Sequence, residues 1–153
     1  MKLTKIILLA AIAGLLWLAG ANDAENSALT EPVKYIFNRY LKIRAALAKD
    51  SLAGVAESAN AIKEAVRGDA KTLPAEVGTQ AEALAKASDL NSARAAFKPL
   101  SDALIQYFAD HKAKGTYVEV YCPMARASWL QADRNVNNPY FGPAMSGCGQ
   151  IQD

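Results

Sequence analysis

Residues 89–115 read DLNSARAAFKPLSDALIQYFADHKAKG and carry the clearest helical pattern in the chain. Apolar residues recur there at alternating steps of three and four, which places them on one face of a helix. These positions are Leu90, Ala93, Phe97, Leu100, Leu104, Phe108 and His111, with Tyr107 beside them. Asp89 is a suitable N-cap. Pro99 interrupts the hydrogen bonding but the stripe keeps its phase, so we expect one helix kinked near residues 95–99.

Three further amphipathic segments precede this helix. The first follows a Thr30 cap, the second follows a cap at Asp50 or Ser51, and the third opens at residues 73–76 with proline near its first position. Four helices with short connections predict a mainly α fold. We expect an antiparallel four-helix bundle over residues 30–115.

Helical patterning stops at the end of this region. Residues 116–121 alternate between apolar and polar and predict one short strand, whereas residues 128–131 are expected to form a helical turn. Later residues are rich in Asn, Pro and Gly, which indicates an ordered irregular loop. Residues 149–151 can pair with the strand as a hairpin. Residues 116–153 are thus expected to pack on the bundle, within a single domain over residues 30–153.

The N-terminus has the pattern of a signal peptide. Two lysines precede an uncharged apolar run of about 13 residues, too short for a membrane span of about 20, and small residues end at Ala21. We predict a signal peptide over residues 1–21 that is cleaved after Ala21, and a flexible stretch over residues 22–29. The protein is then exported to the periplasm with no membrane attachment. The alternative is an uncleaved N-terminal anchor.

Composition excludes several classes of function. The full chain has 17 basic and 15 acidic residues, and both lysines of the predicted signal peptide are lost on cleavage, so the mature protein is formally neutral. No basic face for nucleic acid is implied. A single histidine without an evident serine partner, and the lack of a phosphate-binding glycine loop, argue against an enzyme.

Four sulfur-bearing side chains lie near the C-terminus: Cys122, Met124, Met145 and Cys148. They are both cysteines of the chain and both methionines besides the initiator. Thiolate and thioether are soft donors that favour Cu(I) or Ag(I), whereas zinc prefers Cys and His and calcium requires carboxylates. Pro123 favours an extended Cys122, which would point Cys122 and Met124 to one side. Met145 and Cys148 have the spacing of one helical turn.

Other interpretations of these sulfurs stay open. Cys122 and Cys148 can form a structural disulfide in an exported protein, contributing on the order of 3 kcal/mol. Met124 and Met145 can fill gaps in the core. A catalytic thiol is a third possibility, although its base could only be His111.

His111 is the only histidine, eleven residues before Cys122. Our preferred interpretation is an interaction with the end of its own helix. The alternative makes His111 a further candidate metal ligand.

The C-terminal motif resembles that of a known bacterial family. It comprises Tyr121-Cys122-Pro123-Met124-Ala125, Trp129, Asn138-Pro139-Tyr140-Phe141-Gly142, Met145 and Cys148-Gly149. The run of Asp89, Arg94, Phe97 and Leu100-Ser101 is similar to the family's middle region. The family is an exported domain of unknown function, found alone and fused to periplasmic adaptor subunits of copper- and silver-type heavy-metal efflux systems. The resemblance covers roughly residues 30–151, and Tyr121 replaces a histidine that many members have.

This resemblance implies that Cys122, Met124, Met145 and Cys148 are metal ligands, and that a periplasmic efflux adaptor is a partner. The sequence thus predicts a periplasmic Cu(I)- or Ag(I)-binding protein for heavy-metal resistance, which buffers the ion or delivers it to efflux by ligand exchange. The alternative is a non-enzymatic structural or protein-interaction module of the cell envelope, clamped by a Cys122–Cys148 disulfide and without a cofactor.

Overall fold

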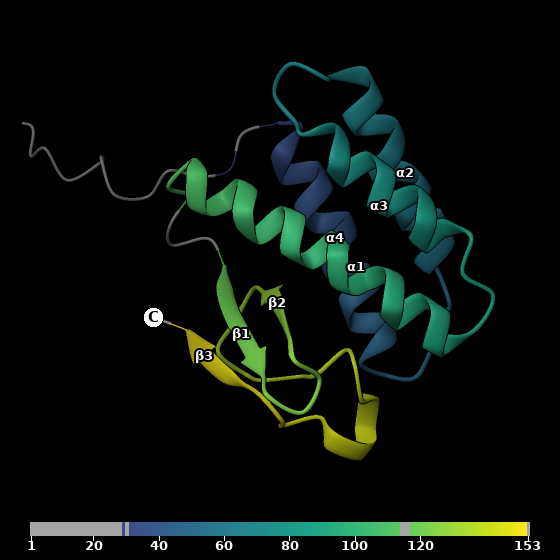
Figure 1. Cartoon of the computed structure of the whole chain (residues 1–153), viewed down its shortest axis with the longest axis vertical. Coiled ribbons are helices and arrows are strands. Elements are labelled where there is room, and N and C mark those ends of the chain that lie inside the picture. The colour runs from purple at the N-terminus through teal and green to yellow at the C-terminus, as the bar shows by residue number, and fades with distance from the viewer. Residues whose placement is uncertain (1–28, 30, 114–116, 153) are drawn as a thin grey trace, which may run out of the picture.

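The computed structural model describes residue 29, residues 31–113 and residues 117–152. The predicted signal peptide, its cleavage site and nearly all of the stretch before the first helix lie outside these residues. Four helices come first and a three-stranded sheet follows (Figure 1). The elements are α1 Val33–Leu47, α2 Val55–Gly68, α3 Ala75–Ala85, α4 Leu90–Asp110, β1 Val118–Cys122, β2 Ala127–Gln131, the 3-10 helix η1 Gly142–Met145 and β3 Gln150–Gln152. The predicted mainly helical class is confirmed.

The helices share one apolar core. α1 packs on α2, α2 on α3 and α3 on α4, and α1 also touches α4. The predicted stripe of α4 is largely buried, and the helix runs through Pro99 without a break, as expected. Its N-cap is Asp89, whose Oδ1 accepts a hydrogen bond of 2.9 Å from the Ser92 backbone N–H. Local spacing and capping therefore determine α4 as the sequence predicts.

The start of α2 differs from the prediction. Its N-cap is Gly54, with φ of +73°, rather than Asp50 or Ser51. Ser51 Oγ instead accepts a hydrogen bond of 3.1 Å from the Ala53 backbone, and Asp50 pairs with Arg94. A left-handed glycine redirects the chain into α2 because glycine adopts this conformation at little cost. Both candidate caps are thus occupied elsewhere.

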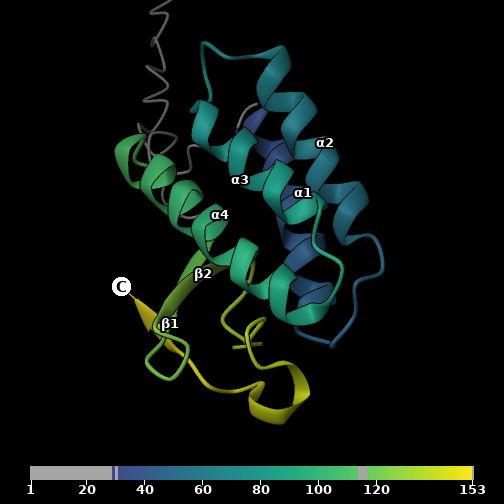
Figure 2. The same ribbon diagram turned by 45° about the vertical axis from the view of Figure 1, so that its right-hand side comes forward.

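The strands form an antiparallel sheet in the order β2-β1-β3. The sheet lies on one side of α4, and β2 contacts both α4 and α1 (Figures 1 and 2). β3 pairs with β1, with Tyr121 opposite Gln150 and Val120 opposite Ile151. The predicted pairing of residues 149–151 with the first strand is therefore confirmed.

The predicted helical turn over residues 128–131 is wrong, because this segment is strand β2. It pairs with β1 through a tight turn over residues 123–126, in which Arg126 has φ of +48°. Trp129 and Leu130 are both fully buried. Their burial, together with backbone pairing to β1, outweighs the weak local preference on which the helical turn rested.

Tyr40 joins the helices to the sheet. Its hydroxyl lies 2.8 Å from Ser101 Oγ on α4 and accepts a hydrogen bond of 3.0 Å from the Leu130 backbone on β2. Its ring stacks on Phe97, with centroids 5.0 Å apart. Burial raises the pKa of Tyr40 far above its ordinary value, so the phenol stays neutral. One buried side chain thus connects α1, α4 and the C-terminal segment.

Candidate metal centre

The fold brings the two cysteines together. Cys122 ends β1 and is fully buried, and Cys148 is partly exposed just before β3. Their Sγ atoms lie 2.7 Å apart, and both are free thiols. The two strands run antiparallel with Tyr121 opposite Gln150, so the residues flanking this pair are neighbours. The predicted meeting of the two sulfur segments is confirmed for the cysteines.

Gly149 allows this close approach. A Cβ atom at this position would lie 2.6 Å from Val120 Cγ1 and 2.7 Å from Trp129 Cη2. Real Cβ atoms essentially never come so close to another heavy atom, so any side chain here would push the segment away from the sheet. Glycine thus lets the backbone beside Cys148 lie directly against Val120 and Trp129.

Asn138 supports the segment that carries Cys148. It is fully buried, and its side-chain amide donates a hydrogen bond of 2.6 Å to the Cys148 carbonyl. Its backbone N–H donates to the Ser146 carbonyl at 2.8 Å, and its Oδ1 accepts from the Tyr140 N–H at 2.7 Å. Because a buried amide is costly to leave unpaired, these bonds favour one position for residues 138–148.

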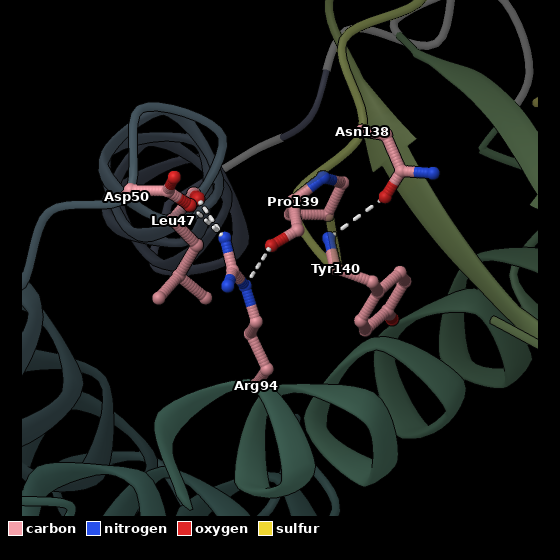
Figure 3. Close-up of polar contacts among 6 residues, drawn as sticks. All are labelled: Leu47, Asp50, Arg94, Asn138, Pro139 and Tyr140. Carbon is pink, nitrogen blue, oxygen red and sulfur yellow. Dashed lines mark hydrogen bonds and ion pairs between the residues drawn. The ribbon is translucent and has the colours of Figure 1, made fainter. Parts of the chain in front are cut away.

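Arg94 ties the same loop to the helices, as Figure 3 shows. Its Nε donates to the Pro139 carbonyl at 2.9 Å, and its Nη2 donates to the Leu47 carbonyl at 3.0 Å and pairs with Asp50. Gly142 has φ of +58°, and a Cβ there would collide with the Asp50 carboxylate. A single guanidinium thus joins α4, the end of α1 and the loop that leads to Cys148.

The two thiols differ in acidity. Burial alone would raise the pKa of Cys122, but hydrogen bonds from the Cys148 thiol, the backbone N–H groups of Ala125 and Met124, and the Asn138 side chain outweigh it. The net effect lowers the pKa of Cys122. The pKa of Cys148 is raised, first by its hydrogen bond to Cys122 and then by burial and the neighbouring charge. Cys122 is therefore the thiol that ionises first, and Cys148 keeps its proton and donates a hydrogen bond to it.

We predict that the reduced protein ionises in two separate thiol steps, one below and one above the ordinary thiol pKa. Between the lowered pKa of Cys122 and its ordinary value the unfolded chain binds more protons, so stability rises with pH. Above the ordinary value, up to the raised pKa of Cys148, the folded chain binds more protons and stability falls. Reduced protein should be most stable near the ordinary thiol pKa.

Ultraviolet absorbance of the thiolate, followed against pH, measures the two steps, and thermal unfolding over the same range measures the maximum. Cys148→Ala is the matched variant, because it removes the thiol donor and should raise the pKa of Cys122. A single step of two protons at the ordinary pKa would contradict the prediction.

Both methionines are exposed, and each is close to one of the cysteines along the chain. Met124 lies in the turn after β1 and is 67% exposed, and Met145 ends η1 and is 37% exposed. The interpretation of these residues as core fillers is therefore wrong. Cys122 is extended at the end of β1, as expected, but the expectation that Cys122 and Met124 point to one side is wrong, because the chain turns at residues 123–126 and leaves Cys122 buried and Met124 exposed. The expected turn between Met145 and Cys148 is present, with the Cys148 N–H donating to the Met145 carbonyl at 3.0 Å.

His111 lies at the end of its own helix. It is the C-cap of α4, its Nδ1 is 2.8 Å from the Tyr107 carbonyl, and its ring stacks on the Tyr107 ring at 4.1 Å. The preferred interpretation of this histidine is confirmed. Within residues 31–113 and 117–152, no group of three or more His, Cys, Asp and Glu side chains is placed to hold a metal ion. The structure does not bring His111 together with the cysteine pair.

Sequence reasoning missed the residues that support the pair. Arg94 and Asn138 were part of the family resemblance, but their roles depend on contacts across 45 and 10 residues of chain. Gly149 was also part of the motif, but the sequence does not show that Val120 and Trp129 leave no room for a side chain there. The available signal was that the family motif includes polar residues and glycines. The motif does not identify the residues that they contact.

The structure defines a mainly helical domain with a small antiparallel sheet that carries a pair of thiols, one buried and one partly exposed. Residues 36–116 match the model of a family described as a protein of unknown function, DUF3347. This match covers more than half of the chain, so the protein belongs to that family. It includes most of the helical region and ends before β1, so the cysteine pair lies outside it. Comparisons with curated proteins and with solved structures give no match.

None of the helices in the described part of the chain combines the length and apolar character needed to cross a membrane.

Proposed function

We propose that this protein binds Cu(I) or Ag(I) in the periplasm through Cys122 and Cys148, with Met124 and Met145 as accessory ligands. The observation that carries the proposal is the cysteine pair, whose sulfurs lie 2.7 Å apart, with an exposed methionine two residues after Cys122 and another three residues before Cys148. Two soft thiolates and two soft thioethers in one segment suit a monovalent soft ion better than zinc or calcium.

The lowered pKa of Cys122 supports this assignment, because a metal ligand must be the thiolate. Its thiolate is favoured by four hydrogen-bond donors, one of them the Cys148 thiol. When the ion binds, the Cys148 proton is released and the ion replaces the shared hydrogen. An ion bonded to both sulfurs by bonds of about 2.3 Å holds them farther apart than they lie now. Cys148, in the partly exposed segment before β3, moves outward to make this room.

The exposure of the methionines suggests an order of events. Met124 and Met145 meet the ion first, because Cys122 is fully buried. The ion then passes to the thiolates, and the soft donors of a partner remove it by the reverse exchange, one ligand at a time. This protein therefore acts as a non-enzymatic buffer or carrier. Its partner is a periplasmic adaptor of a heavy-metal efflux pump, as the family resemblance implies, and it needs neither nucleic acid nor membrane attachment.

The scaffold in this proposal is an antiparallel helix bundle with residues 116–153 packed on it as one domain. The bundle holds the C-terminal segment through Tyr40 and Arg94. Export follows from the signal peptide predicted over residues 1–21.

A second candidate is a structural module of the cell envelope that is clamped by a Cys122–Cys148 disulfide and binds no metal. The same sulfur separation favours it, because thiols this close can be oxidised to a disulfide with little movement of the backbone. Oxidation would also release a bound ion, so the two states can alternate in one protein.

Anaerobic titration of the reduced protein with Cu(I), against a chromophoric Cu(I) chelator, tests the proposal. We expect one ion per chain, displacement by Ag(I), and far weaker binding of Zn(II). Thiol counting on freshly isolated protein distinguishes the second candidate, which requires no free thiols. If the fully reduced protein does not compete with the chelator for Cu(I), the metal proposal is wrong.

A further inference from the structure

A second concave site lies apart from the sulfur pair, between the end of α1 and residues 133–146. It is a pocket of about 570 Å³, within the range of small-molecule sites. Arg44 of α1 lines it, together with Asp133, Asn135 and Ser146 at its exposed rim. Its wall combines one cation and one carboxylate with several neutral hydrogen-bonding groups.

Arg44 is incompletely paired at the base of this pocket. The side chain is half-buried, and its Nη1 donates to the Asn137 carbonyl at 3.1 Å. Its Nε is buried and has no hydrogen-bond partner, the only such side-chain atom among the described residues. No carboxylate in the described part of the chain lies within ion-pair distance of Arg44. A buried N–H without a partner is costly, so a small turn of the guanidinium that brings Nε to a ligand in the pocket would recover that free energy.

The Asp133 carboxylate acts on Arg44 from beyond ion-pair distance. Burial lowers the pKa of Arg44, and the negative charge of Asp133 acts against this lowering. Asp133 Oδ1 accepts a hydrogen bond of 2.8 Å from the Asn135 N–H, which holds the carboxylate at the rim. This placement leaves the guanidinium without direct neutralisation and opposes ligands of high negative charge.

We propose that this pocket binds a carboxylate group through Arg44, with Asn135 and Ser146 contacting the rest of the ligand. The planar edge of a guanidinium, which includes Nε, matches the two oxygens of a carboxylate in a paired arrangement. The Asp133 charge at the rim favours a monoanion over a phosphate dianion. The carboxylate belongs to a small organic acid or to the C-terminus of a peptide. Both sources present the same carboxylate group and differ in the part of the molecule attached to it.

Chemical-shift titration of the purified protein tests the site with four probes: acetate, N-acetylalanine, inorganic phosphate and the neutral analogue acetamide. Acetate and N-acetylalanine should shift the signals of Asn135, Asn137 and Ser146, and phosphate should bind more weakly. Acetamide should leave them in place. Tighter binding of N-acetylalanine than of acetate indicates a peptide C-terminus, and equal binding indicates small free acids. Equal response to acetate and acetamide overturns the proposal.

Two variants with opposite expected effects sharpen the test. Arg44→Gln should lower the acetate affinity at least about tenfold. Asp133→Asn should raise it about fivefold, because it removes a repelling charge and keeps a side-chain oxygen that accepts from the Asn135 N–H. Arg67→Gln is the matched control, because Arg67 is 79% exposed and carries the same charge away from the pocket. It should change nothing. If Arg44→Gln does not fold, Asp133→Asn decides alone: tighter acetate binding supports the site, and unchanged or weaker binding overturns it.

Discussion

Replacing Cys122 with serine is expected to lower the Cu(I) affinity of the reduced protein at least about 100-fold, or roughly 3 kcal/mol. A hydroxyl is a hard, protonated donor at neutral pH and cannot replace a soft thiolate. Cys148→Ser should have a similar effect, because two-coordinate binding requires both sulfurs. The measurement is competition with a chromophoric Cu(I) chelator under anaerobic conditions.

The methionine variants separate the two classes of ligand. Met124→Leu and Met145→Leu should each lower the affinity by about tenfold or less, since a neutral thioether contributes less than a thiolate. They should slow transfer from the chelator more than they alter the equilibrium, because the methionines are the exposed donors. Leucine keeps the size and apolar character of methionine, so the fold is unaffected.

The cysteine variants need a control for folding, because Cys122 is fully buried. Circular dichroism and thermal unfolding of Cys122→Ser and Cys122→Ala provide it. If both variants fold and both retain the affinity of the wild type, the assignment of Cys122 as a ligand is wrong.

Replacing Arg94 with methionine is expected to lower the free energy of unfolding by about 2–4 kcal/mol. The substitution keeps much of the side chain's length but removes hydrogen bonds to the Pro139 and Leu47 carbonyls and the pairing with Asp50. The Arg94 side chain is only 17% exposed, so water replaces these bonds poorly. Urea unfolding followed by circular dichroism measures the loss.

Release of the loop in Arg94→Met should also make Cys148 more accessible. Cys148 is expected to react faster with an alkylating reagent in Arg94→Met than in the wild type, since the loop before it is no longer held at Pro139. Asp50→Asn should cost less than about 1 kcal/mol, because Asp50 is 47% exposed and asparagine still accepts a hydrogen bond. Arg67→Met is the control for loss of an exposed arginine. Equal stability losses in Arg94→Met and Arg67→Met would contradict the role of Arg94.

Contacts within a few residues explain what could be predicted for the helices. The apolar stripe of α4 and the capping box of Asp89 and Ser92 involve steps of three or four residues. The local sequence therefore contains all the residues that take part. The predicted N-cap of α2 is wrong because it depends on a contact that is not local. Asp50 is a good cap by residue type, but its carboxylate is used by Arg94, 44 residues away. Local preference cannot include a competitor so distant in the chain.

The C-terminal segment shows the same division. Alternation predicted β1 and allowed β3 to pair with it, and this pairing placed the cysteines together. The segment Ala127–Gln131 was misassigned because its strand state depends on pairing with β1 and on burial of Trp129. The exposure of the methionines also depends on tertiary structure, because Met124 lies in the turn over residues 123–126 and Met145 lies at the end of η1.

By itself, the sequence determined the helical class, the soft-donor chemistry of four sulfurs and the alternating pattern of β1, because periodicity and residue type are local properties. Only the tertiary structure decided that Cys122 is buried against Cys148, that both methionines face solvent and that His111 remains with its helix. The physical reason is that the register of the sheet and the contacts of Tyr40, Arg94 and Asn138 join segments up to 90 residues apart. Such contacts form only when the core packs, and they set which sulfurs meet.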